Sequence, residues 1–416
     1  MDPAPKTAAP AVAPPVTATA TDPLHDAGRR AALKVAALVL LLGMAFVGAR
    51  LLAHGGDATA FISAGDHVTD PAGAPTLTVK EDSDGYDGQY FHRLARDPFT
   101  QEAREFGTRL DRPAYRHQRI GYPLLVWAVT GGRADLVPAA LIAVNLVALG
   151  GLAYGAARLA IEAGRPAQWG LVAAGWPGLI VALSYDLSEV LAASLLMATI
   201  LAIRRGRWPA ATALLLAAGA TRETALILAV AIVAAAVLRC APFRRWSRAL
   251  TGTHDGPPVP LVVGLVPLAA AAAFRVFLTA GWSDVPTTGA DIPSFVGVPF
   301  LALVRQLAAW VGSADAVDLY QFFQLVVVLA VLATLARGLW DTGAGRPHER
   351  LALVGALTIL AMVPVWDRSV VFLRWPTEAV IFGFAVMVDA RRVPIRQLLE
   401  GVGALAATTA LVWISI

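Results

Sequence analysis

The chain has 416 residues, of which 57% are hydrophobic and only 15% are charged, which excludes an ordinary soluble domain as its main part. The net charge of +4 comes from short arginine clusters between apolar runs, a topology signal of membrane proteins rather than a nucleic-acid surface. The single cysteine, Cys240, excludes an intramolecular disulfide and a cysteine-based zinc site. We therefore expect an all-α, polytopic transmembrane helical bundle that binds no nucleic acid.

The N-terminal segment 1–30 is rich in Ala, Pro and Thr and lacks apolar periodicity, which predicts a disordered cytoplasmic tail. The apolar run that follows has basic residues before it, a pattern shared by signal peptides and first membrane spans. Because this run continues past Arg50, the sequence favours an uncleaved span over 32–53. The transmembrane domain is accordingly expected over 31–416.

Basic clusters stay on the cytoplasmic side of a membrane, so they set the orientation of the apolar runs. Placing all of the arginine clusters inside gives about eleven crossings with a cytoplasmic N-terminus. The expected spans are 32–53, 136–157, 168–184, 187–203, 209–220, 224–238, 259–280, 319–336, 351–365, 370–388 and 398–416. This predicts a multi-pass protein of the cytoplasmic (inner) membrane, with a large first extracytoplasmic loop over 54–135.

Two apolar pieces are unsuited to crossing the membrane. The piece 120–129 is too short, and 296–311 is interrupted by Pro299 and Arg305. Making either piece a span would place a basic cluster outside. Both are therefore expected to be helices that lie on or dip into the outer leaflet.

The most acidic segment, 81–87, lies in the large loop after the first span. It holds four carboxylates, Asp84 and Asp87 among them, and Asp87 leads into aromatic and apolar residues at helical spacing. Carboxylates beside a membrane-lying helix are placed where a lipid-borne substrate presents its head group. The alternative is a solvated acidic loop with a turn at Asp84-Gly85.

Further charges fall at the same predicted outer ends of spans. They include Glu189, Arg222, Glu223, Arg374, Glu378, Arg116 and Arg119, and the last two lead with Tyr122 into the short outer helix. The position of each charge, taken alone, is explained by a long side chain that extends from a helix end into water. Arg222 and Glu223 together are also explained as an ion pair in a hairpin turn. The convergence of the charges from several segments instead indicates the charged rim of a cavity, because ionisable groups near membrane depth are rare unless they pair or bind something.

These residues resemble the motifs of GPI-type mannosyltransferases, which belong to the GT-C superfamily of polytopic glycosyltransferases. The segment Tyr86-Asp87-Gly-Gln-Tyr90-x-x-x-Leu94-Ala95 is similar to their aromatic-Asp-x-x-Tyr-x-x-Ile-Ala motif after the first span. Later pieces come in the matching order: Arg119-Ile-Gly-Tyr122-Pro123, Tyr185-x-x-Ser-Glu189, Arg204-Arg-Gly-Arg207 and Thr221-Arg222. The resemblance is closest to bacterial GT-C-like proteins of cell-surface glycopolymer formation. It covers about the first 240 residues, and Glu223 departs from it, because the mannosyltransferases usually have proline there.

The resemblance implies an inverting enzyme that transfers a hexosyl or pentosyl group from a polyprenyl-phosphate donor to a glycan or lipid acceptor on the extracytoplasmic face. It makes Asp87 the base, with Asp84 as a partner that orients the acceptor or a metal ion. Arg119, Arg222 and Arg374 become candidates for binding the donor phosphate. The remaining substrate-binding candidates are Gln89, Tyr90, Tyr122, Glu189 and Glu223, although the ring of Tyr90 is expected to pack the loop helix against the bilayer. No cofactor is implied with certainty, and a divalent metal is left open.

Two other functions stay open. A transporter or flippase of a lipid-linked or small polar substrate is the first, but such proteins usually show inverted repeats and ionisable residues at mid-membrane. The sequence shows no repeat, and its charges lie at the outer ends of spans. The second is a non-catalytic assembly subunit, which would keep the fold and make the acidic loop dispensable.

Overall fold

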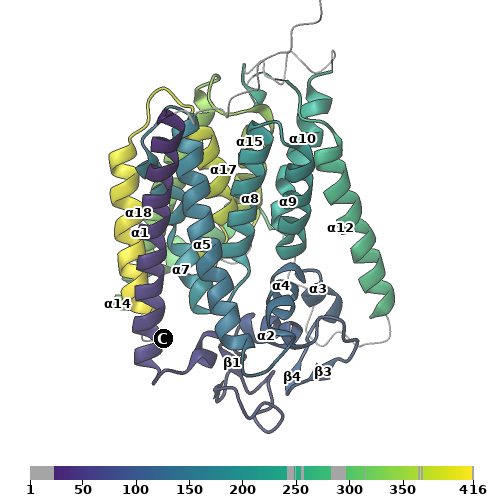
Figure 1. Cartoon of the computed structure of the whole chain (residues 1–416). Coiled ribbons are helices and arrows are strands. Elements are labelled where there is room, and N and C mark those ends of the chain that lie inside the picture. The colour runs from purple at the N-terminus through teal and green to yellow at the C-terminus, as the bar shows by residue number, and fades with distance from the viewer. Residues whose placement is uncertain are drawn as a thin grey trace, which may run out of the picture.

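The computed structural model describes residues 23–240, 248, 250–253, 257–282, 297–313, 315–363, 366 and 369–414. The chain forms a helical bundle with a cap of short helices and turns at one end (Figure 1). The described residues contain only two strand pairs, of two residues per strand: β1 (Ala64–Gly65) with β2 (Val79–Lys80), and β3 (Arg104–Glu105) with β4 (Thr108–Arg109). The fold is therefore all-α, as the sequence predicts.

Among the described residues, five helices are long and apolar enough to cross a membrane. They are α1 (Pro23–Ala53), α5 (Val137–Glu162), α12 (Val262–Gly281), α14 (Ala316–Ala336, continued by η4, Arg337–Trp340) and α18 (Ile395–Trp413). A sixth candidate is a pair bent by 52°, in which η2 (Ala167–Gly170) and α6 (Leu171–Ala174) are followed by α7 (Pro177–Ser184). The bend precedes Pro177, which disfavours helical geometry in the residue before it. These helices indicate a multi-pass membrane protein.

The prediction of eleven crossings is wrong, because the structure supports five to six. Five of the predicted spans form helices of 16 residues or fewer: α8 (Glu189–Arg204), α9 (Trp208–Thr221), α10 (Ile227–Leu238), α15 (Pro347–Met362), and α16 (Ser369–Arg374) with α17 (Thr377–Met387). At about 1.5 Å per residue, such helices reach roughly 24 Å at most, less than the ~30 Å hydrocarbon core. Apolarity alone overcounts spans, because a short helix buried inside a bundle is as hydrophobic as one that faces lipid.

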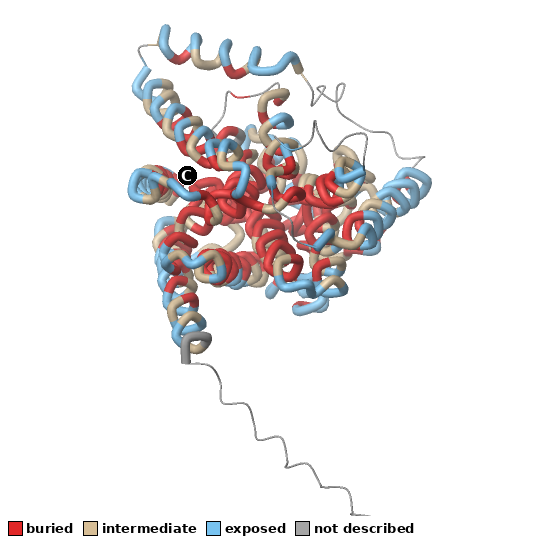
Figure 2. Tube along the Cα trace, turned by 90° about the horizontal axis from the view of Figure 1, so that it is seen from above, coloured by how far each residue is buried: buried red, intermediate tan, exposed pale blue. Residues whose placement is uncertain are grey.

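The outer surface of the bundle is apolar, whereas its centre is densely filled. Viewed along the bundle, buried residues fill the middle and exposed ones face outwards from the peripheral helices (Figure 2). Leu42, Val147 and Phe277 are each more than 60% exposed, which suits contact with lipid. α1 begins at Pro23, so the end of the predicted tail 1–30 is helical, and residues 1–22 lie outside the described part.

The predicted large loop 54–135 forms the cap. It contains η1 (Ala58–Phe61), α2 (Gly88–Arg96), α3 (Pro113–His117) and α4 (Gly121–Thr130). The apolar piece 120–129 corresponds to α4, and the described part of 296–311 contains α13 (Leu301–Val311). Neither helix is long enough to be a candidate span, in agreement with the sequence prediction. The cap lies where α1 ends and α5 begins (Figure 1), and η3 (Glu223–Leu226) joins α9 to α10.

Candidate functional site

Asp87 stands immediately before α2 and is held in place by close backbone packing. The next residue, Gly88, lies so near the connection between α7 and α8 that an added Cβ would be 2.4 Å from the carbonyl oxygen of Tyr185. The same Cβ would be 2.6 Å from the carbonyl oxygen of Ile62. Only glycine permits such an approach, so it fixes the start of α2 against the bundle.

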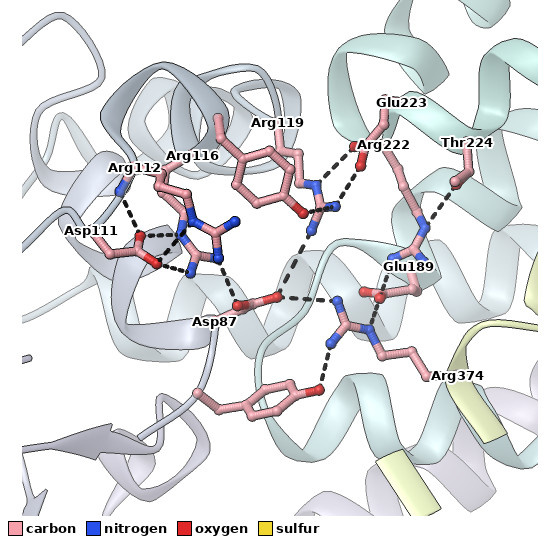
Figure 3. A network of polar contacts seen from close by, with 12 residues as sticks. Asp87, Asp111, Arg112, Arg116, Arg119, Glu189, Arg222, Glu223, Thr224 and Arg374 are labelled. Atoms are coloured by element: carbon pink, nitrogen blue, oxygen red, sulfur yellow. Dashed lines mark hydrogen bonds and ion pairs between the residues drawn. The ribbon is translucent and has the colours of Figure 1, made fainter. Parts of the chain in front are cut away.

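Asp87 contacts three arginines, which lie around its carboxylate in Figure 3. Arg116 Nη1 donates to Oδ1 at 2.7 Å, and Arg374 Nη2 donates to Oδ2 at 3.1 Å. Arg119 Nη1 lies 3.8 Å from Oδ2. Arg116 and Arg119 belong to α3 and the turn after it, whereas Arg374 ends α16. The carboxylate therefore joins the cap to the C-terminal half of the bundle.

Glu189, the first residue of α8, connects two of the buried arginines. Arg374 Nε and Arg222 Nη1 both donate to its Oε1. Arg222 Nε also donates to Glu378 Oε1 at 2.7 Å. Because Glu189 is fully buried, it depends on these cations, since an unpaired charge in such surroundings would cost several kcal/mol (about 3–5).

Glu223 accepts a two-point hydrogen bond from Arg119. Nε donates to Oε2 at 2.8 Å and Nη2 to Oε1 at 2.5 Å, and Nη2 also donates to the hydroxyl of Tyr115 at 2.6 Å. The alternative in which Arg222 and Glu223 pair at a turn is not what the structure shows, because Arg222 bonds to Glu189 and not to its neighbour.

The Asp87 network, as we call these ion-paired residues, carries no net charge. Five arginines stand against five carboxylates: Arg112, Arg116, Arg119, Arg222 and Arg374, with Asp87, Asp111, Glu189, Glu223 and Glu378. An anion that enters must therefore draw an arginine away from a carboxylate of the network.

The network changes the acidity of its carboxylates. Burial raises the pKa of Asp87, but the positive charges of Arg116, Arg374 and Arg119 outweigh this effect and hold the pKa well below its usual range. Burial likewise opposes the effect of Arg119 on Glu223, whose pKa falls to about 2. A general base works best when its pKa is near the operating pH, so Asp87 is a weak base while it is paired in this way.

Six of the predicted site residues meet in the network, and two others hold the loop before it. The six are Asp87, Arg119, Glu189, Arg222, Glu223 and Arg374. Asp84 lies apart from them, with its side chain 90% exposed and 3.1 Å from His67 Nδ1. Gln89 is fully buried, donates to the backbone carbonyl of Asp84 at 2.8 Å and accepts from Thr69 Oγ1 at 2.9 Å. Its contacts are those of a residue that shapes the loop.

Two predicted tyrosines also have packing partners. The ring of Tyr90 lies under the guanidinium of Arg116, 3.8 Å from its carbon to the ring centroid, so this ring supports an arginine of the network. Tyr122 is fully buried, and its hydroxyl donates to the carbonyl of Leu141 and accepts from Asn145, both at 2.9 Å. Tyr122 therefore joins α4 to α5 and does not reach the network.

Four members of the network were not among the predicted site residues: Arg112, Arg116, Asp111 and Glu378. Asp111 accepts from Arg116 Nε at 2.7 Å and Nη2 at 2.8 Å, which aims the remaining nitrogen at Asp87. Glu378 follows Arg374 by one helical turn, and this spacing would suggest a local pair. Glu378 pairs with Arg222 instead, so the one available sequence signal would have given the wrong partner.

An apolar groove of about 680 Å³ adjoins the network between α3, α9 and α12. Its polar lining residues are Arg112, Tyr115, Gln118, Glu223 and Arg275. Its walls are apolar and include Leu216, Leu226, Pro267, Ala270 and Phe274. The groove is therefore amphipathic, and it shares Arg112 and Glu223 with the Asp87 network.

Comparison with known proteins does not identify the site. No family model, curated protein or solved structure matches this chain. Within the described ranges, no three His, Cys, Asp or Glu side chains are grouped so as to hold a metal ion. The interpretation of the site therefore rests on its own geometry and on the resemblance of its motifs.

Proposed function

We propose that the protein is an integral membrane glycosyltransferase of GT-C type. It transfers a sugar from a polyprenyl-phosphate donor to a glycan or lipid acceptor, with inversion, at the extracytoplasmic face. The observation that carries the proposal is the contact of one carboxylate, Asp87, with three arginines beside an amphipathic groove. Carboxylate, phosphate-binding cations and an apolar channel are the three elements that transfer from a lipid phosphate requires.

The reaction follows from these elements. The acceptor hydroxyl oxygen attacks the anomeric carbon, and Asp87 takes the hydroxyl proton. The bond between that carbon and the phosphate oxygen breaks, and polyprenyl phosphate leaves with the electron pair. The arginines stabilise the negative charge that develops on the leaving phosphate. Arg119 and Arg374 are best placed for this role, because each already contacts Asp87.

The neutral network gives Asp87 a resting and a working condition. In the resting condition its three arginines keep its pKa too low for an effective base. A donor phosphate that takes Arg119 or Arg374 removes positive charge from Asp87 and so raises its basicity. Binding of the donor therefore raises the basicity of Asp87. Without donor, Asp87 stays ion-paired with its arginines and is a weak base.

The groove supports a lipid-linked donor over a water-soluble one. Its apolar walls suit an isoprenoid chain, and two of its polar lining residues, Tyr115 and Glu223, accept hydrogen bonds from Arg119. The arginine-rich ends of α8 and α15 lie at the far end of the bundle, where Arg204 pairs with Glu349. Positive charge marks the cytoplasmic side, so the network faces the extracytoplasmic side.

One observation favours the non-catalytic alternative. Every charge of the Asp87 network already has a partner, as in a network that only holds the cap on the bundle. A single experiment separates the two functions. Purified protein is incubated with a panel of polyprenyl-phosphate sugars and acceptors, and released polyprenyl phosphate is measured. We expect release with one donor and none from Asp87→Asn, whereas a structural network would give no release with any donor.

A further inference from the structure

A basic groove lies at the end of the bundle opposite the Asp87 network. α17 spans the distance between them, because Glu378 in its first turn belongs to the network and Met387 at its end lines the groove. The groove measures about 600 Å³ and lies where α14 ends and α18 begins. Both helices are candidate membrane spans, so the groove is at the level where a span leaves the membrane. In Figure 1 this is the end of α18 away from the C-terminus.

The groove is lined by four arginines, Arg165, Arg337, Arg391 and Arg392, and by no acidic residue. Arg165 has partners: it donates to the backbone carbonyls of Val388 at 3.1 Å and Ala390 at 2.5 Å, and it lies over the ring of Trp169 at 4.9 Å. It therefore builds the wall of the groove.

The guanidinium groups of the other three arginines make no hydrogen bond or ion pair with any residue that the structure describes. Two acidic groups lie nearby but do not line the groove, and the charge of one of them, Asp341, acts on Arg391. Asp341 accepts from the backbone amide of Arg391 at 2.9 Å, and Asp389 pairs with Arg204 at 2.9 Å. Three cations from two separate segments thus face one groove without a counter-charge inside it.

We propose that this groove binds the phosphate of an anionic phospholipid head group from the surrounding membrane. Arginine forks match phosphate oxygens, and basic pockets between spans bind anionic head groups on the cytoplasmic side. The apolar lining residues that keep exposed surface, Val393 and Pro394, offer contact for the start of an acyl chain. Trp169 is an aromatic of the kind enriched at membrane interfaces. The proposal is independent of glycosyl transfer.

The test uses the full chain, purified in a neutral detergent and titrated with phosphatidylglycerol or phosphatidylcholine, with bound lipid counted by native mass spectrometry. We expect tighter binding of phosphatidylglycerol, and a loss of roughly fivefold for each of Arg391→Gln and Arg392→Gln, since a basic residue near anionic lipid contributes about that factor. Arg391→Lys and Arg392→Lys keep the positive charge and should retain most of the binding. Retained binding would show that substitution at these positions leaves the fold intact.

Arg396→Gln is the matched control. Arg396 lies at the same end of the molecule, is 87% exposed on its side chain and pairs with Glu400 at 2.7 Å, but it does not line the groove. Equal binding of the two lipids, or an equal loss in Arg396→Gln, would overturn the proposal. So would displacement of the lipid by an equal concentration of inorganic phosphate, because the groove would then be a site for the free anion.

Discussion

Arg374 donates hydrogen bonds to both Tyr86 and Asp87, at 2.7 Å to the hydroxyl and 3.1 Å to the carboxylate. The bond to Asp87 spans 287 positions of the sequence, so α16 is bound directly to the loop that carries the candidate base. The resemblance to GT-C enzymes covers only the first 240 residues or so. Arg374 lies outside that stretch and was a candidate without a family motif, and the structure brings it into direct contact with Asp87.

This relationship predicts how Arg374→Gln changes the pH dependence. The variant removes one of three positive charges around Asp87, so the pKa of Asp87 rises from its depressed value towards that of an ordinary carboxyl, about 4. A base must be deprotonated, so the acid limb of the pH–rate profile of kcat/KM should move to higher pH. Arg396→Gln removes an exposed charge at the other end and should leave the limb in place. An acid limb that stays fixed in Arg374→Gln would argue against Asp87 as the base.

The membrane class and part of the site were predictable, because they depend on local patterns. Long apolar runs identify α1 and α5 whatever their neighbours. The charges at the outer ends of apolar runs were correctly expected to converge, as Glu189 and Arg222 show. The number of spans was not predictable in this way, because apolar helices such as α9, which packs one face against the bundle, are too short to cross.

The pairing within the site depends on tertiary structure. Sequence proximity suggests that Arg222 pairs with Glu223, yet each of them pairs with a residue from another segment. Tyr122 and Gln89 have polar groups that looked available for a substrate, but both are buried by contacts with distant segments. The choice of partner follows from how the helices pack against one another, and a single sequence does not record that packing.

Gly88→Ala should destabilise the cap. The added Cβ meets two backbone carbonyl oxygens, of Tyr185 and Ile62, and neither can move aside as a flexible side chain would. Overpacking of this kind costs about 1–3 kcal/mol. We expect a lower midpoint of thermal unfolding in detergent. Gly48→Ala is the control, because no atom lies within 4 Å of its added Cβ, and helix propensity favours alanine there by up to about 1 kcal/mol. Equal midpoints for the two variants would contradict the close packing.

The loop before Asp87 should loosen as the pH rises. The hydrogen bond with Asp84 is the main cause that raises the pKa of His67 above its usual value, and the charges of Asp66 and Asp82 add to it. Protonated His67 therefore stabilises the folded loop. This stabilisation is fully present below about pH 6.5, the pKa of histidine in the unfolded chain, and is lost as the pH rises through the higher pKa of the folded state. Limited proteolysis within 80–86, compared at pH 6 and pH 9 with a pH-insensitive protease, should show faster cleavage at the higher pH. His67→Gln should remove this difference, and a persistent difference would assign it to another group.

Cys240 reports the orientation of the bundle. It is exposed and follows α10, next to Arg239, and positive charge marks the cytoplasmic side. A membrane-impermeant maleimide should label it only after the cells are opened. Labelling in intact cells with a permeable outer wall would reverse the orientation, and the Asp87 network would then face the cytoplasm.

Asp87→Asn is the central test of the candidate base. The amide keeps the size of the side chain, but its single oxygen can accept from only one of Arg116 and Arg374, which donate to different oxygens of Asp87, and it cannot take a proton. General-base catalysis contributes about 10²–10⁴-fold, so transfer should fall by at least that lower factor. Asp84→Asn makes the same chemical change three positions away, on a side chain that is 90% exposed and outside the network, and should cost much less. Amounts of protein in the membrane should be alike for both variants. Near-normal glycopolymer output from Asp87→Asn, in cells that lack the native copy, would remove the base from the proposed mechanism and favour a network that only holds the cap to the bundle.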